Sequence, residues 1–137
     1  MTSIPKPEII NSIICILIVL ILTFLFVFPR QYVISFVSDI IESTQNMKDG
    51  VIKKNKEKAL KNSESMIERF NASSDILKLF LNHEDVDELG LHINSCHYAL
   101  KLDDYADHAA IIVDAETILS ICEYLFDVET LSLYNLF

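Results

Sequence analysis

Hydrophobic positions follow two patterns along this chain, one continuous and the other periodic. Residues 9–29, 21 in all, contain no charged residue and consist mostly of Ile, Leu, Val and Phe. Polar side chains enter this run, the apolar segment, at three positions: Asn11, Ser12 and Thr23. A helix of that length spans roughly 30 Å, the thickness of a bilayer's hydrocarbon core. Because a helix satisfies its own backbone hydrogen bonds, residues 1–30 are predicted to be a tail and a single transmembrane anchor.

Two alternatives fit the apolar segment less well. A cleaved secretory signal has a shorter core, about 7–15 apolar residues, and ends in a small-residue cleavage site. This run ends instead in Phe-Val-Phe-Pro-Arg, at residues 26–30. A core helix of a soluble protein usually keeps a polar stripe, and no such stripe is present here.

The side of the membrane that the remainder faces depends on few charges. Lys6 and the α-amino group precede the apolar segment, whereas Arg30 follows it and the next basic residue is Lys48. Since basic residues near a span favour the cytoplasmic side, we expect a short inner tail and an extracytoplasmic body.

Periodic apolar positions dominate the body, residues 31–137. It has only two glycines and no proline, which argues against an all-β fold with many turns. A first helix is predicted at 31–48, with Pro29 either in its first turn or at a kink, and with a turn at Asp49-Gly50. Its apolar face contains Val33, Phe36, Val37, Ile40, Ile41, Thr44 and Met47.

Three further helices are predicted. The second is long, could bend at residues 71–74, and has a basic outer face. The third begins in the acidic stretch 83–88, and the turn after it lies at Asp103-Asp104. The three apolar faces contain Ile52, Ala59, Leu60, Ser63, Met66, Ile67, Phe70, Ser74, Leu77 and Leu81; then Val86, Leu89, Ile93, Cys96, His97 and Leu100; then Tyr105, Ala109, Ile112, Ala115, Leu119, Cys122 and Phe126.

Short connections between these helices imply antiparallel neighbours. The predicted fold is therefore all-α, with a single N-terminal transmembrane helix followed by an antiparallel bundle of about four helices. Residues 131–137, Leu-Ser-Leu-Tyr-Asn-Leu-Phe, are too apolar for a loose tail. We expect them to fold back on the bundle, with docking on a partner or on the membrane as the alternative.

Charge is unevenly distributed along the body. Residues 48–69 hold seven basic and four acidic side chains, whereas residues 83–137 hold twelve acidic side chains and one basic, Lys101. The net charge of −9 argues against a nucleic-acid partner, because phosphate binding needs a basic face. Either the basic helix offsets the acidic ones, which we favour, or the acidic half recruits a cation or a basic partner.

Candidate chemistry is sparse. Asp85, Asp87 and Gly90 match three positions of an EF-hand calcium loop, but Leu89 and Cys96 stand where oxygen ligands are required. His92 and His97 are five residues apart and diverge on a helix, so they do not form a zinc pair. A zinc site of His97 with Cys96 and Cys122 has little support, because no paired Cys-x-x-Cys or His-x-x-x-His motif is present. We expect His97 to be a hydrogen-bonded core residue, and the histidines His83 and His108 carry no motif.

The cysteines are predicted to be free. Cys15 lies in the apolar segment, and antiparallel helices turning near Asp103-Asp104 would hold Cys96 and Cys122 too far apart for a disulfide. No nucleophile elbow, phosphate-binding glycine loop or zinc-protease motif is present. We therefore assign no catalytic, cofactor-binding or metal-binding residue and expect no enzyme.

Two stretches resemble a known family. Residues 77–102, including Leu-Phe-Leu-Asn-His-Glu-Asp at 79–85, and the ending at 131–137 are similar to the domain-of-unknown-function 4363 family. The resemblance covers residues 38–137, although members often have a Trp near Phe70, where this chain has none. It implies a small bacterial protein of spore-forming Gram-positive lineages, with one span and a helical body beside a multi-span membrane protein of the envelope or spore membranes. It implies no catalytic residue.

The sequence thus indicates a membrane-anchored interaction module. The bilayer and another envelope or membrane protein are its expected partners, and the acidic third and fourth helices are the expected binding surface. The alternative is a sensor domain that binds a small ligand or a metal ion through the same acidic helices.

Overall fold

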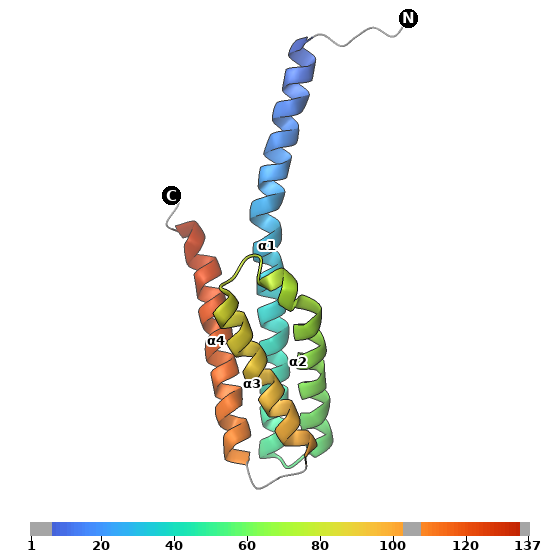
Figure 1. Ribbon diagram of the computed structural model, residues 1–137, viewed down its shortest axis with the longest axis vertical. Helices are drawn as coiled ribbons and strands as arrows, with labels where there is room; N and C mark the ends of the chain where they lie inside the picture. Colours follow the sequence, from blue (N-terminus) through green and yellow to red (C-terminus); the bar gives the residue numbers. More distant parts are fainter. Residues whose placement is uncertain (1–6, 103–107, 135–137) are drawn as a thin grey trace, which may run out of the picture. The chain divides into compact units, whose positions relative to one another are not determined.

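The computed structural model describes residues 7–102 and 108–134, and it describes side chains for residues 8–102 and 108–128. These residues form four α-helices and no strand, which confirms the all-α prediction (Figure 1). The helices are α1 (Pro7–Ile52), α2 (Lys56–Leu77), α3 (His83–Lys101) and α4 (His108–Tyr134). The chain divides into two compact units, residues 1–32 and residues 33–137.

The first unit contains the apolar segment, and its side chains are not buried. Large apolar side chains at positions 9–28 are between 40% and 68% exposed. The hydroxyl groups of Ser12 and Thr23 donate to the backbone carbonyls of Glu8 and Val19, at 3.0 and 2.8 Å. Both side chains therefore satisfy their hydrogen bonds within one turn of their own helix, which lowers the cost of placing them in an apolar medium.

Pro29 lies inside α1 rather than at the start of a helix. The prediction of a separate helix beginning at residue 31 is therefore wrong, because α1 continues from Pro7 to Ile52. Proline removes one backbone hydrogen bond from a helix interior, a cost of about 3 kcal/mol. The many helical residues on either side of Pro29 outweigh that local cost.

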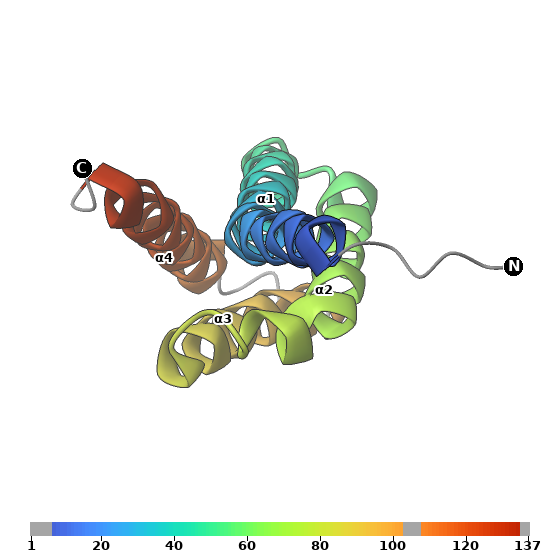
Figure 2. The ribbon, with the colours of Figure 1, turned by 90° about the horizontal axis from the view of Figure 1, so that it is seen from above.

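The second unit is an antiparallel four-helix bundle formed by the later part of α1 with α2, α3 and α4. Successive helices run in opposite directions (Figure 1), and they surround a common centre when viewed from above (Figure 2). Side-chain contacts join each helix to its neighbours: Thr44 to Met66, Ser63 to His97, His92 to Asp114 and Lys48 to Glu116.

The core contains one stripe of side chains from each helix. The predicted stripes of the body part of α1 and of α3 are buried, with Phe36, Met47 and Ile93 fully so, except that Ile41 and His97 are only half-buried. On α2, Ser73 is buried and Ser74 is only half-buried, whereas Ile52 is 64% exposed and lies in α1. On α4 the predicted Ala115 and Cys122 are buried, but Ile111, Ile118 and Leu125 are buried in place of the predicted neighbours Ile112, Leu119 and Phe126.

The connection between α1 and α2 lies three residues after the predicted turn at Asp49-Gly50. Lys54 adopts a left-handed backbone with φ of 55°, and the amides of Lys54 and Asn55 donate to the carbonyls of Val51 and Gly50. These two hydrogen bonds form a Schellman motif, a common helix end. Gly50 serves packing instead, because a Cβ there would lie 2.8 Å from the backbone nitrogen of Ala59.

Helix α2 continues through residues 71–74 and ends at Leu77. A short turn follows, and the side chain of Asn82 then accepts a hydrogen bond from the amide of Glu84 and caps α3. The predicted turn at Asp103-Asp104 and the side chains of residues 131–137 lie outside the described part of the structure. The backbone of α4 is helical as far as Tyr134.

Candidate functional site

The EF-hand residues do not form a loop. Asp85, Asp87 and Gly90 all lie within α3, whose helical backbone directs the side chains of Asp85 and Asp87 to different sides. Within residues 7–102 and 108–134, no three His, Cys, Asp or Glu side chains cluster closely enough to hold a metal ion. Gly90 has a packing role, because a Cβ there would lie 2.5 Å from the ring of Phe70.

The two cysteines of the bundle are buried and free, as predicted. Burial raises the pKa of the Cys96 thiol to about 12, and the nearby charge of Asp114 adds to this effect. Burial likewise raises the pKa of Cys122 to about 12, with a contribution from Glu123. Since the thiolate is the reactive form, both groups are chemically quiet at neutral pH.

His97 is a hydrogen-bonded residue at the edge of the core, as predicted. Its Nδ1 lies 3.1 Å from the hydroxyl of Ser63 on α2, and that hydroxyl also donates to the carbonyl of Leu60. The contact joins α2 to α3, and a second one, from the hydroxyl of Thr44 to the sulfur of Met66, joins α1 to α2. Both satisfy polar groups inside the bundle and therefore have a structural role.

Asp114 gathers the one serine–carboxylate–histidine group of the described side chains. Its two oxygens lie 2.8 Å from Nδ1 of His92 and 2.5 Å from the hydroxyl of Ser95. The carboxylate thus stands between serine and histidine, whereas nucleophilic catalysis requires the histidine beside the serine. This group links α3 to α4, and the sequence motifs did not indicate it.

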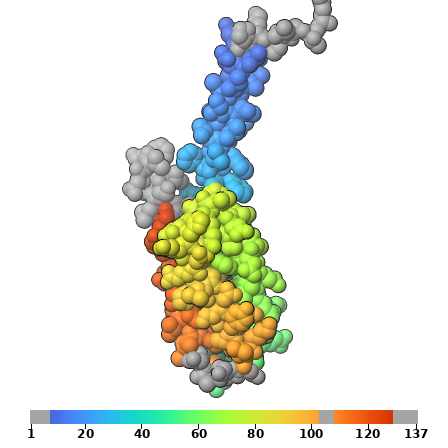
Figure 3. All heavy atoms as spheres, viewed as in Figure 1, coloured from blue at the N-terminus to red at the C-terminus, as the bar shows by residue number. Residues whose placement is uncertain are grey.

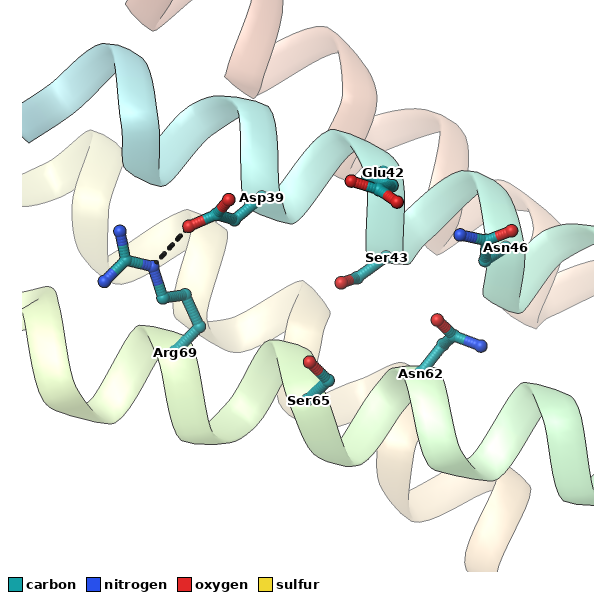
Figure 4. A pocket seen from close by; sticks show the side chains of 7 residues that line it. All are labelled: Asp39, Glu42, Ser43, Asn46, Asn62, Ser65 and Arg69. Carbon is teal, nitrogen blue, oxygen red and sulfur yellow. Dashed lines mark ion pairs between the residues drawn. The ribbon is translucent and has the colours of Figure 1, made fainter.

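A polar groove of about 360 Å³ runs between α1 and α2 (Figure 4). Arg69 and Asp39 form an ion pair across it, with 2.8 Å between Nε and Oδ2. The other side chains that line it are Glu42, Ser43, Asn46, Asn62 and Ser65. Because the groove mixes both charges with amides and hydroxyls and faces solvent, its chemistry favours no particular ligand.

The outward face of α3 carries a different surface, the α3 outer stripe. Six residues lie within about 40° of one line along the helix, at 100° per residue, and all are exposed: Glu84, Glu88, Leu91, Ser95, Tyr98 and Leu102. Leu91 is 67% exposed, Tyr98 59% and Leu102 76%. α3 faces the viewer in the space-filling view (Figure 3). The stripe is acidic where α3 begins and apolar where it ends.

Ion pairs join basic side chains both to the acidic helices and to α1. Lys48 pairs with Glu116 of α4, and Lys78 pairs with Asp87 of α3 at 2.5 Å. Other ion pairs join α2 to α1, as in the pair of Lys58 with Asp49 at 2.7 Å. Hydrogen bonds from Lys53 and Lys58 lower the pKa of Asp49. Basic side chains of α1 and of the turn after α2 thus offset acidic side chains of α4 and α3.

The apolar part of the α3 outer stripe was missed at the level of sequence. Leu91, Tyr98 and Leu102 are spaced seven and four residues apart, which is a helical repeat. That repeat was overlooked because a stronger apolar repeat, Leu89, Ile93, Cys96 and Leu100, occupies the same helix and faces the core.

Comparison with known proteins gives a match to one protein family model. A family model, domain of unknown function DUF4363, matches residues 27–136, most of the chain. Neither the curated proteins nor the solved structures contain a match. The match covers the whole described bundle together with the end of the apolar segment, so the resemblance found in the sequence is confirmed, and the chain belongs to the DUF4363 family.

Proposed function

We propose that this protein is a membrane-anchored helical module that binds another membrane or envelope protein through the α3 outer stripe. The observation that carries the proposal is the exposure of three large side chains, Leu91, Tyr98 and Leu102, along one helix face. A line of exposed apolar side chains on one helix face is typical of an interaction surface. Exposed apolar residues that are scattered singly are common and need no such explanation.

Anchoring is supported by the apolar segment. One helix of the described chain is long and apolar enough to cross a membrane, and none of its most apolar stretch is buried by protein. Water is a poor solvent for residues 9–28, which are all exposed and mostly apolar, whereas lipid is a good one. A signal anchor that stays uncleaved is the form that fits the chain best.

Partner chemistry follows from the two ends of the stripe. Tyr98 and its apolar neighbours suit the centre of an interface, where aromatic side chains contribute most of the binding energy. Glu84 and Glu88 are exposed beside them. A helix with an apolar face and basic residues at one end would complement both parts, and the acidic end would set its orientation.

Photocrosslinking in native membranes tests this surface. A photoreactive residue placed at Leu91 or Tyr98 is expected to give one discrete adduct, and Glu88→Lys is expected to reduce it. The matched control is Glu68 on α2, which is also exposed but lies outside the stripe. Adducts of equal yield from Glu68 and Leu91, or none from either stripe position, would refute the proposal.

We also propose that the bundle faces the extracytoplasmic side, in line with the basic residues before the span. The buried thiols of Cys96 and Cys122 provide a quiet background for labelling. In intact cells, Glu64→Cys is expected to react with a membrane-impermeant maleimide. Reaction only after the cells are lysed would place the bundle in the cytoplasm.

A further inference from the structure

One end of the bundle is defined by contacts between its helices. Thr44 of α1 contacts Met66 of α2. Because the two helices are antiparallel, Val33, eleven residues before Thr44, lies level with Leu77, eleven residues after Met66. Lys48 of α1 likewise contacts Glu116 of α4. Val33, fifteen residues before Lys48, therefore lies level with residue 131, fifteen residues after Glu116. The start of the body part of α1, the end of α2 and the last turn of α4 therefore share one end, the anchor-side end.

An apolar turn protrudes from this end. Leu79 and Phe80 follow α2 directly, with exposed fractions of 75% and 40%, and Ile76 in the last turn of α2 is 37% exposed. The amides of Leu79 and Phe80 donate to carbonyls of α2 at 3.1 and 3.0 Å. The turn thus holds its own backbone hydrogen bonds while it presents two large apolar side chains to the surroundings.

A short stretch of chain joins the anchor-side end to the apolar segment. Val33 lies only five positions after Phe28 in the sequence. Five residues reach at most about 18 Å when extended and about 8 Å as a helix, whatever the orientation of the two units. The headgroup region of a bilayer is roughly 5–8 Å thick on each side. An anchored chain therefore keeps Val33, at the anchor-side end, within about 18 Å of the end of the apolar segment, which is within reach of the headgroup region.

We propose that the anchor-side end is a second membrane contact, in which Leu79 and Phe80 enter the headgroup region of the bilayer. The inference rests on the proposed anchor. Lipid is the favoured occupant because the short tether keeps this end of the bundle within reach of the bilayer and because aromatic and apolar side chains concentrate at headgroup depth. Lys78 pairs with Asp87, and Asp75 and Glu84 are exposed nearby, so the contact does not depend on anionic lipid.

The absence of tryptophan from the chain permits a direct test. Three variants of the full chain each carry one tryptophan: Leu79→Trp at the turn, Leu102→Trp as the matched control, and Leu20→Trp in the apolar segment. Leu102 is 76% exposed, like Leu79 at 75%, but it lies where α3 ends, at the opposite end of the bundle. Each variant is reconstituted in phosphatidylcholine vesicles, with and without bromine on the acyl chains.

The proposal predicts that brominated lipid quenches the tryptophan emission of the Leu20→Trp and Leu79→Trp variants and leaves that of Leu102→Trp unchanged. If Leu20→Trp is quenched while Leu79→Trp is quenched no more than Leu102→Trp, the second contact is overturned and the anchor stays intact. Unquenched emission from Leu20→Trp would remove the anchor, and with it this inference.

Burial of the turn against protein gives a different pattern. In that case the Leu79→Trp variant has blue-shifted emission that brominated lipid does not quench and that reverts when the protein is diluted in lipid. Such a result would mean that a second copy covers the turn, and it would overturn the proposal. Phe80→Trp repeats the measurement at the neighbouring position if circular dichroism finds Leu79→Trp unfolded.

Discussion

The two parts of α1 have the same helical backbone but differ in the exposure of their apolar side chains. Before Pro29 the large apolar side chains are exposed on every side, with Phe24 62% exposed. After residue 32 only one face is apolar, and Val33, Phe36 and Ile40 on that face are fully buried. The helix therefore passes from a stretch that matches lipid to a stretch that matches a protein core.

The two parts of α1 also differ in where their polar side chains form contacts. In the apolar segment, even the hydroxyl groups of Ser12 and Thr23 bond to their own helix. In the bundle, polar groups reach other helices, as when Thr44 contacts Met66 and Asp39 contacts Arg69. Long-range polar contacts thus belong to the part of α1 that packs against protein, and substitutions on either side of residue 32 can test that division.

The largest expected effect comes from removing an aromatic ring on either side of the division. Phe36→Ala is expected to lower the free energy of unfolding by about 3–5 kcal/mol, because Phe36 is fully buried. Phe24→Ala is expected to leave it unchanged. Thermal unfolding of the full chain in detergent, followed by circular dichroism, measures both. Equal losses in the two variants would contradict the division.

A charge placed in the apolar segment has the next largest effect. Leu20→Arg is expected to impair insertion, since a central arginine costs about 2.5–3.5 kcal/mol on insertion scales. Leu91→Arg, on the exposed side of α3, is the matched control and is expected to insert normally. Membrane fractionation of expressing cells compares them. Normal insertion of Leu20→Arg would mean that residues 9–29 do not span the bilayer.

Packing at Gly90 sharpens the description of the bundle side. Gly90→Ala is expected to destabilise the bundle by about 1–3 kcal/mol, because its Cβ would collide with the Phe70 ring. That loss exceeds the gain of up to about 1 kcal/mol in helix propensity. Adding Phe70→Leu to Gly90→Ala is expected to restore part of the loss. Stability equal to that of the unmodified chain would show that α2 and α3 are less closely packed than described.

Alkali tests the buried thiols, whose effect is absent at neutral pH and appears only above about pH 9. An unfolded thiol loses its proton above about pH 9, whereas Cys122 in the bundle keeps it up to about pH 12. The stabilisation is therefore complete below pH 9 and is lost between pH 9 and 12, at about 1.4 kcal/mol per pH unit for this thiol. Denaturant unfolding across that range is expected to give a shallower pH dependence for Cys122→Ala, and an equal slope would contradict the burial.

Sequence patterns predicted most of the fold because three helices have one clear apolar stripe each. Helix α4 does not. Ile111, Ile112 and Val113 are adjacent apolar residues, as are Ile118 and Leu119, so two neighbouring faces are equally apolar. Contacts with other helices select the buried face, and sequence periodicity contains no information about them.

The polar contacts were beyond prediction for a related reason. His92 and Asp114 lie 22 residues apart in the sequence, and their pairing depends on the register between α3 and α4. Gly50 was misread as a turn residue because glycine serves both turns and close packing. The chain turns instead at Lys54, a residue type that rarely adopts a positive φ.

Extraction with alkaline carbonate tests the central claim most directly. If residues 9–29 span the bilayer, the intact chain stays in the membrane pellet after the wash, even though that pH weakens the bundle. If the intact chain is released into the supernatant, the apolar segment is not an anchor, and the proposed module and its second membrane contact both fail.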